Sequence, residues 1–306
     1  MRKAKAQINV DKLKVCFRAN EYLTKTLMDG FNLNGNREKS ENDHIIDFSD
    51  FRLVCVDSND DKMSVALDIQ MDGKQHRMGY YQFPLNGKYK PYTFFEAENR
   101  ALYTDFLPWL PYKNNTICLL EDISASMGLC FNNITYVELA LDTNLNILQS
   151  VKRAIRNYQD IEMIYNGRKI TTPNRKIENY TVTYGGSRKR LYSNRPTIRC
   201  TQVDGVEIKV YNKTAEMEEA TPEKLDYIPQ WNGTGHQNIY RAEITVRNPD
   251  ITAFCDATGT DKAEALFSLQ SDEWRAKLWV WAANRLLRFR DKHTGESIDI
   301  IDTLIL

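Results

Sequence analysis

Short segments rich in β-branched and aromatic residues, separated by polar turns, recur through the first hundred residues of the chain. Such segments predict β-strands. The segment 92–107 has the same texture and is expected to form one more strand before Pro108 interrupts the chain. The other four predicted strands, bounded by polar or glycine-containing turns, are 12–19, 51–58, 63–70 and 76–85.

From residue 116 onward, helical and strand patterns take turns. Apolar residues in 116–131 recur at helical spacing, whereas those in 134–144 alternate strictly, so a helix is expected to lead into a strand. An amphipathic segment after Asn146 predicts another helix. Further along, two strands are predicted at 206–213 and 240–248, with an acidic, proline-containing loop at 216–230 between them, and a helix at 261–290.

These elements predict an α+β fold. We expect a mainly antiparallel sheet with helices on one face, an open polar face on the other, and an additional C-terminal helix. The expected organisation is one domain over residues 1–255 and a helical extension over 256–306. A break near 108–115 would allow the first of these to consist of two related α+β halves.

Composition narrows the function classes. The 306-residue chain has zero formal net charge, no apolar stretch like a signal sequence and no membrane-length apolar segment, so we expect a soluble cytoplasmic protein with no membrane partner. Its six cysteines are widely spaced, which favours free thiols. The four histidines form no closely spaced pair, and no GxxxxGK[ST] or GxGxxG motif occurs. Zinc-dependent and nucleotide-dependent schemes are therefore disfavoured.

Charge is distributed unevenly along this neutral chain. Residues 168–199 contain nine Lys or Arg and a single acid, Glu178. Such a segment is suited to binding the phosphate backbone of DNA, and its tyrosines are suited to stacking on unpaired bases. The residues expected to bind DNA there are Arg188, Lys189, Arg190 and Arg195.

Each of three predicted strands has one polar face. Residues two apart on a strand point the same way, and in each of these strands the opposite face is apolar. The ordinary interpretation is a solvated face whose charges pair across strands. If the strands are neighbours, however, the face would gather carboxylates, cations and a tyrosine: Glu138 and Asp142 from the first strand, Glu207, Lys209, Tyr211 and Lys213 from the second, and Arg241 and Glu243 from the third.

That combination fits cleavage of DNA by a tyrosine. A tyrosine hydroxyl, with an ordinary pKa of about 10, can form a covalent link to phosphate if a base or cation assists it. We expect Tyr211 to be the nucleophile, with Lys213 beside it and with Tyr184 and Tyr192 as rivals. Oxygen ligands suit Mg²⁺ or Mn²⁺, and the predicted metal ligands are Glu138, Asp142 and Glu243.

This scheme imposes a structural condition. The side-chain oxygens of Glu138, Tyr211 and Glu243 must converge to within about 5–8 Å, given metal–ligand distances near 2.0–2.6 Å.

The order of the motifs resembles the trans-acting Rep family of rolling-circle plasmid and phage replication initiators. The resemblance covers about residues 117–250 and consists of an acidic strand ending in Asp142, a Gly-Ser-Arg turn at 186–188, Tyr-x-Lys at 211–213 and Arg-x-Glu at 241–243. In two places the sequence departs from the family pattern, because Tyr136 and Lys209 stand where the family usually carries arginine.

The resemblance implies a site-specific nicking and closing endonuclease. It would bind a double-stranded origin, link the 5′-phosphate of one strand to a tyrosine and leave a 3′-OH to prime synthesis. It also implies a homodimer and a host helicase as partner, and it places Arg241 at the DNA. Two alternatives stay open: a non-catalytic origin-binding or regulatory protein, and a mobilisation relaxase with similar tyrosine chemistry.

Overall fold

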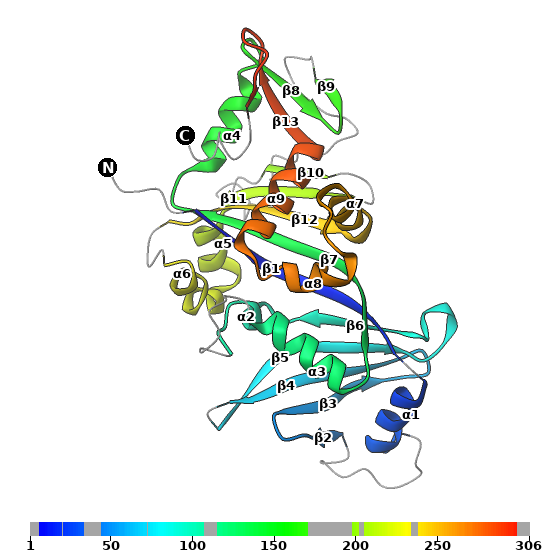
Figure 1. The fold of residues 1–306 in the computed structure, drawn as a ribbon. Coiled ribbons are helices and arrows are strands. Elements are labelled where there is room, and N and C mark those ends of the chain that lie inside the picture. Colours follow the sequence, from blue (N-terminus) through cyan, green and yellow to red (C-terminus); the bar gives the residue numbers. More distant parts are fainter. Residues whose placement is uncertain are drawn as a thin grey trace. The chain divides into compact units, whose positions relative to one another are not determined.

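The computed structural model describes residues 6–19, 21–33, 44–71, 73–106, 115–170, 198–201, 205–233 and 238–298. Helices accompany a large antiparallel sheet in it, which confirms the predicted α+β class (Figure 1). None of the helices in this part of the chain is long and apolar enough to cross a membrane.

The chain divides into two compact units. Neither unit ends at residue 255, where the sequence predicts a boundary. Unit 1 comprises Met1–Asp11, Val137–Gly259 and Ser271–Leu306, and unit 2 comprises Lys12–Tyr136 and Thr260–Gln270. Two strands, β1 (Ala6–Arg18) and β7 (Cys130–Thr143), contribute residues to both units.

Unit 2 is built on antiparallel strands that confirm four of the predicted strands in the first hundred residues. The predicted strand over 92–107 is shorter than expected, because it ends at Ala97 and a short helix comes next. Outward from β1, the strand order is β6 (Tyr92–Ala97), β5 (Lys74–Pro84), β4 (Lys62–Met71), β3 (Phe51–Ser58) and β2 (Ile45–Asp47).

Helices cover one face of the unit 2 strands (Figure 1). Tyr81 on β5 is completely buried, and its hydroxyl lies 2.9 Å from Ser124 Oγ on α3. Its ring also packs against Phe17 and Phe95, which are buried on the same face. The helical elements of unit 2 are α1 (Glu21–Gly30), η1 (Gly87–Tyr89), α2 (Asn99–Leu102), α3 (Thr116–Ser126), η4 (Lys262–Glu264) and α8 (Ala265–Ser268).

Unit 1 contains two groups of strands. In the larger, the order is β10 (Ile198–Thr201), β11 (Glu207–Asn212), β12 (Tyr240–Arg247), β7 and β1. The smaller has the order β14 (Ser297–Ile298), β13 (Leu287–Asp291), β8 (Ile161–Tyr165) and β9 (Arg168–Ile170).

The Trp-rich C-terminal helix packs on the apolar face of the larger group. Ser271 caps α9 (Asp272–Leu286) by accepting a hydrogen bond from the Trp274 backbone N–H. Trp279 is fully buried, and its indole N–H donates to the Ala242 carbonyl on β12. The predicted helix over 261–290 is therefore interrupted: η4 and α8 precede α9, and Leu287 begins a strand. Helices α4 (Ile147–Arg156) and α7 (Asn248–Thr258) complete this layer.

The predicted loop at 216–230 is helical in the structure. It contains α5 (Lys213–Ala220), η3 (Pro222–Asp226) and α6 (Ile228–Trp231). The side chain of Asn212 starts α5 by accepting a hydrogen bond from the Ala215 N–H at 3.1 Å, as N-cap residues do. The strand β11 therefore ends one residue before Lys213, which belongs to the helix.

Candidate functional site

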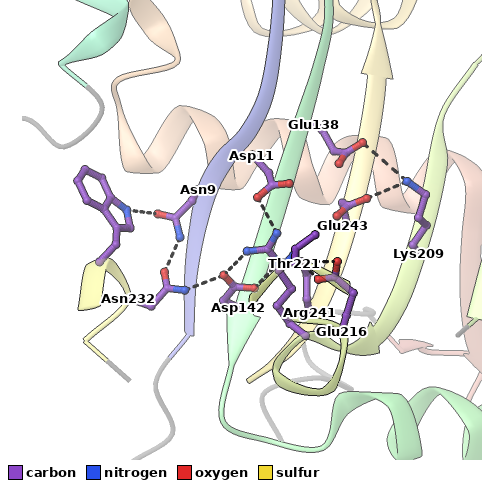
Figure 2. A network of polar contacts seen from close by, with 12 residues as sticks. Asn9, Asp11, Glu138, Asp142, Lys209, Glu216, Thr221, Asn232, Arg241 and Glu243 are labelled. Carbon is purple, nitrogen blue, oxygen red and sulfur yellow. Dashed lines mark hydrogen bonds and ion pairs between the residues drawn. The ribbon is translucent and has the colours of Figure 1, made fainter. Parts of the chain in front are cut away.

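The predicted polar face forms on four adjacent strands of unit 1. β11 and β12 are antiparallel, with Lys209 opposite Glu243 and Tyr211 opposite Arg241. β7 adds Glu138 beside β12, and β1 adds Asp11 beside β7. Figure 2 shows Asp11, Glu138, Lys209, Arg241 and Glu243 pointing toward one another on one face of these strands.

Three buried carboxylates meet at the centre of this face. Asp11, Glu138 and Glu243, here called the carboxylate trio, each offer an oxygen within 4.8 Å of the others. Their exposed fractions are only 3, 3 and 5%. The hydroxyl of Tyr211 donates to Glu243 Oε2 at 2.9 Å. Glu243 thus contacts the Tyr211 hydroxyl and also lies within 4.8 Å of Glu138 and Asp11.

Asp11 was missed by the sequence prediction. The first strand was expected to begin at residue 12, but β1 begins at Ala6. Because Asn9 and Asp11 are two apart, they share a face of this strand and both are buried. The sequence signal that could have identified Asp11 is its position directly after the apolar Val10 in a segment with strand character.

Asp142 was predicted as a metal ligand, but the structure gives it another role. It receives two hydrogen bonds from Arg241, from Nε to Oδ1 at 2.6 Å and from Nη2 to Oδ2 at 2.7 Å. The amide of Asn232 donates a third, also at 2.7 Å. Asp142 therefore orients Arg241 and stands outside the carboxylate trio.

Arg241 was expected to contact DNA, and its burial rules this out in the structure. Its exposed fraction is 0%, and its remaining guanidinium nitrogen Nη1 donates to Asp11 Oδ1 at 2.6 Å. The guanidinium thus joins Asp142 to the trio and compensates buried negative charge.

Lys209 forms ion pairs with two carboxylates of the trio. Its Nζ is 2.8 Å from Glu243 Oε1 and 3.8 Å from Glu138 Oε2 (Figure 2). Glu207 Oε1 is the third neighbour, at 3.5 Å. Burial opposes the charge on Lys209, but the attraction of Glu243 and Glu138 outweighs it and raises the lysine pKa. The ammonium group is therefore charged at any ordinary pH.

The environment of Tyr211 favours the neutral phenol. Burial raises the pKa of Tyr211 well above its ordinary value, and the charge of Glu243 raises it further. For Glu243 itself, burial and Asp11 act to raise the pKa, but Lys209 and other partners lower it overall. Glu243 is consequently an ionised acceptor for a protonated Tyr211 in the resting site.

Lys213 was predicted to lie next to Tyr211 on the same strand face. It instead begins α5, yet its Nζ still lies 5.9 Å from the centre of the Tyr211 ring. The side chain is buried and donates to Glu216 Oε2 at 2.6 Å. Burial, reinforced by the nearby Arg241 charge, lowers the pKa of Lys213.

The segment after β11 closes the polar face at one end. The indole N–H of Trp231 donates to Asn9 Oδ1 at 3.0 Å, and the Asn9 amide donates to Asn232 Oδ1 at 2.6 Å. Together with the bond from Asn232 to Asp142, these contacts anchor α6 to the strands. The polar face was expected to be open, but here its central charges are buried.

The network contains more carboxylates than cations. A buried excess of negative charge is costly unless a counter-charge or protons compensate it. The three carboxylate oxygens of the trio could hold a metal ion, and oxygen donors suit hard divalent cations. The carboxylates are those of Asp11, Glu138, Asp142, Glu207, Glu216 and Glu243, and the cations are Lys209, Lys213 and Arg241.

The predicted DNA-binding residues Arg188, Lys189, Arg190 and Arg195 lie outside the described residues, as do Tyr184 and Tyr192.

Comparison with known proteins finds no matching family model, no matching curated protein and no matching solved structure.

Proposed function

We propose that the chain is a rolling-circle replication initiator that nicks one DNA strand at an origin through a phosphotyrosine at Tyr211. The observation that carries the proposal is the hydrogen bond from Tyr211 to Glu243, a residue that is itself part of the carboxylate trio. A hydroxyl nucleophile, its proton acceptor and a set of oxygen ligands thus come together on one face.

The trio would hold the metal ion. A bound Mg²⁺ or Mn²⁺ would polarise the scissile phosphate and offset the negative charge that develops there. Asp11, Glu138 and Glu243 are its proposed ligands. Arg241 holds Asp11 in place and is itself held by Asp142, so both are positioning residues.

The cleavage step balances with groups on this face. The Tyr211 oxygen forms a bond to phosphorus while the bond from phosphorus to the 3′-oxygen breaks. The phenol proton passes to Glu243, its hydrogen-bond acceptor, and the departing 3′-oxygen takes up a proton from solvent. Attack by the 3′-OH on the phosphotyrosine reverses these changes and closes the strand.

The pKa shifts disfavour proton transfer from Tyr211 to Glu243 when no further positive charge is bound, because the pKa of Tyr211 is raised and that of Glu243 is lowered. Cleavage would therefore depend on the metal and on the phosphate that binds it. A mobilisation relaxase would use the same chemistry, so the site alone supports either type of nicking enzyme.

One observation favours a second candidate function. Lys209 and Arg241 already engage all three carboxylates of the trio through ion pairs. A network closed in this way would also suit a non-catalytic origin-binding protein in which these charges only organise the fold.

A nicking assay separates the two candidates. Supercoiled plasmid bearing the cognate origin is incubated with the full chain and Mg²⁺. Open circles and a covalent protein–DNA adduct are expected, with the phosphate mapped to Tyr211 by mass spectrometry. Tyr211→Phe should abolish the adduct, whereas Tyr158→Phe, which changes an exposed tyrosine of the same unit, should retain it.

Each contrary result has a defined meaning. An adduct that persists in Tyr211→Phe transfers the nucleophile to Tyr184 or Tyr192. Unchanged nicking by both Glu138→Gln and Glu243→Gln contradicts the metal role of the trio, with the exposed Glu273→Gln as matched control. Specific origin binding without any nicking favours the non-catalytic protein.

A further inference from the structure

Unit 2, like unit 1, has a polar strand face. It lies on the side of the strands opposite the face that packs on α3. The alternation of β6 places Phe95 in the core and Phe94 on the other side, where it is only partly buried. In the register of the sheet, Phe94 lies between Cys16 of β1 and Gln82 of β5. We call this side the outer face of unit 2.

Aromatic rings and lysines surround a cavity of about 440 Å³ on the outer face. The rings are those of Tyr89, Phe94 and Tyr136, and the lysines are Lys14 and Lys62. Tyr89 is 53% exposed, and its ring stands edge-on to Phe94 with 6.3 Å between ring centres. None of the described residues that line the cavity is Asp or Glu.

We infer that the outer face of unit 2 binds single-stranded nucleic acid, with bases stacked on Tyr89, Phe94 and Tyr136 and phosphates at Lys14 and Lys62. Proteins that hold single strands without sequence preference combine aromatic stacking surfaces with cations along the backbone path. A strand face with aromatic side chains is a recurrent form of such a surface.

The lysines are available to phosphate. The Nζ of Lys62 reaches Asp57 only at 3.8 Å, and the Nζ of Lys14 reaches Glu96 at 3.4 Å. Both carboxylates are about half exposed, so these pairs are weaker than buried ones. Glu96 is shared, because it also accepts a hydrogen bond from the Tyr136 hydroxyl at 3.0 Å. A third lysine, Lys88, lies 5.0 Å from the centre of the Tyr89 ring and adds positive charge at the rim.

The same features select against other ligands. Bases in a duplex are stacked on one another and cannot offer their faces to aromatic side chains, so duplex DNA would gain only the charge contribution. A neutral glycan could stack on the rings but would leave the lysines without an anionic partner. Single strands use both the rings and the lysines.

This inference goes beyond the proposed function, because the residues belong to unit 2 and the tyrosine site to unit 1. A protein that nicks a duplex leaves a displaced single strand, for which such a face is a suitable holder. The inference is tested without cleavage, so its failure and a failure to nick are distinguishable.

A cross-linking experiment locates the strand. The full chain is irradiated with a short oligothymidylate containing 5-iodouracil, in EDTA so that no metal is bound, and the modified peptides are sequenced. Cross-links at Tyr89, Phe94 or Tyr136 are expected. Cross-links found only at other residues, or none, overturn the inference.

Fluorescence anisotropy with the same oligonucleotide measures the contributions. Tyr89→Ala should weaken binding about 5-fold or more, and Lys62→Gln should reduce the salt dependence by about 0.7 in log–log slope. The controls are Tyr22→Ala, a more exposed tyrosine on α1, and Lys25→Gln on the same helix, both expected to leave affinity unchanged. An effect of the controls equal to that of the cavity variants would also contradict the inference.

Discussion

The two units each carry a polar strand face, yet the faces have opposite characters. In unit 1 the face gathers carboxylates, Lys209 and Arg241, most of them buried. In unit 2 it carries aromatic rings and lysines that stay partly exposed. Strand alternation is common to both, so alternation tells which residues share a face but not whether that face is covered.

The difference arises from the segments that the chain packs against each face. In unit 1, the segment after β11 folds as α5 and α6 and is tied to the strands by Trp231 and Asn232. Charges removed from water in this way must pair with one another. On the outer face of unit 2, Lys14 and Lys62 pair at 3.4 and 3.8 Å with carboxylates that are about half exposed. One face therefore holds its charges in buried pairs, whereas the other leaves rings and lysines partly exposed.

The largest expected effect concerns the buried pairs of unit 1. Arg241→Met removes the partner of Asp142 and Asp11 and leaves two buried carboxylates uncompensated. Loss of one member of a buried ion pair costs about 3–5 kcal/mol, and urea unfolding would measure this loss.

The matched change in unit 2 is Arg52→Met, which breaks the more exposed pair with Asp47. It should cost less than about 1 kcal/mol. Similar losses for the two variants would remove the energetic contrast between buried and exposed pairs.

A smaller effect is expected when Lys209 is replaced by methionine. The ammonium occupies the space between Glu243 and Glu138, where a divalent ion would compete with it. Lys209→Met removes the repulsion between the ammonium and a metal ion about 4 Å away. At an effective dielectric constant near 20, this should strengthen Mn²⁺ binding by roughly tenfold or more.

Titration of Mn²⁺ followed by electron paramagnetic resonance would measure the affinity. Lys277→Met, which changes an exposed lysine of α9, is the control and should leave it unchanged. Equal affinities for Lys209→Met and the wild type would mean that the trio is not a metal site.

The smallest effect concerns the pH dependence of stability. The pKa of Lys213 is lowered by burial, so the unfolded chain binds more protons than the folded chain between this lowered pKa and about 10.4. Stability from this residue therefore rises with pH across that window. In Lys213→Met this rise should disappear, as measured by urea unfolding at a series of pH values. A rise that persists would assign it to another group.

Much of the unit 1 face was predictable from the sequence. Alternation predicts that Glu138, Tyr211 and Glu243 each lie on the polar face of their own strand. In the structure these strands are neighbours, and the three residues share one face of the sheet. The α+β class and most strands were also predictable, because their apolar residues repeat with the period of the element that buries them.

The remaining features depend on contacts between distant residues. Asp11 and Asp142 look alike in sequence and both bind the Arg241 guanidinium, but only Asp11 also offers an oxygen close to Glu138 and Glu243. Lys213 belongs to helix α5 and not to the predicted strand, because the side chain of Asn212 caps the helix at this point. The acidic, proline-containing stretch after it predicts a loop, but in the structure it is helical, and Trp231 binds the distant Asn9.

The place of Asp11 on the first strand has a consequence for synthesis. Its bond to Arg241 joins residues 230 positions apart, and contacts of such sequence separation form late because the chain entropy must be lost first. During translation, this pair cannot form until β12 has left the ribosome. A nascent chain that still lacks β12 has neither Arg241 nor Glu243 and therefore no assembled carboxylate trio.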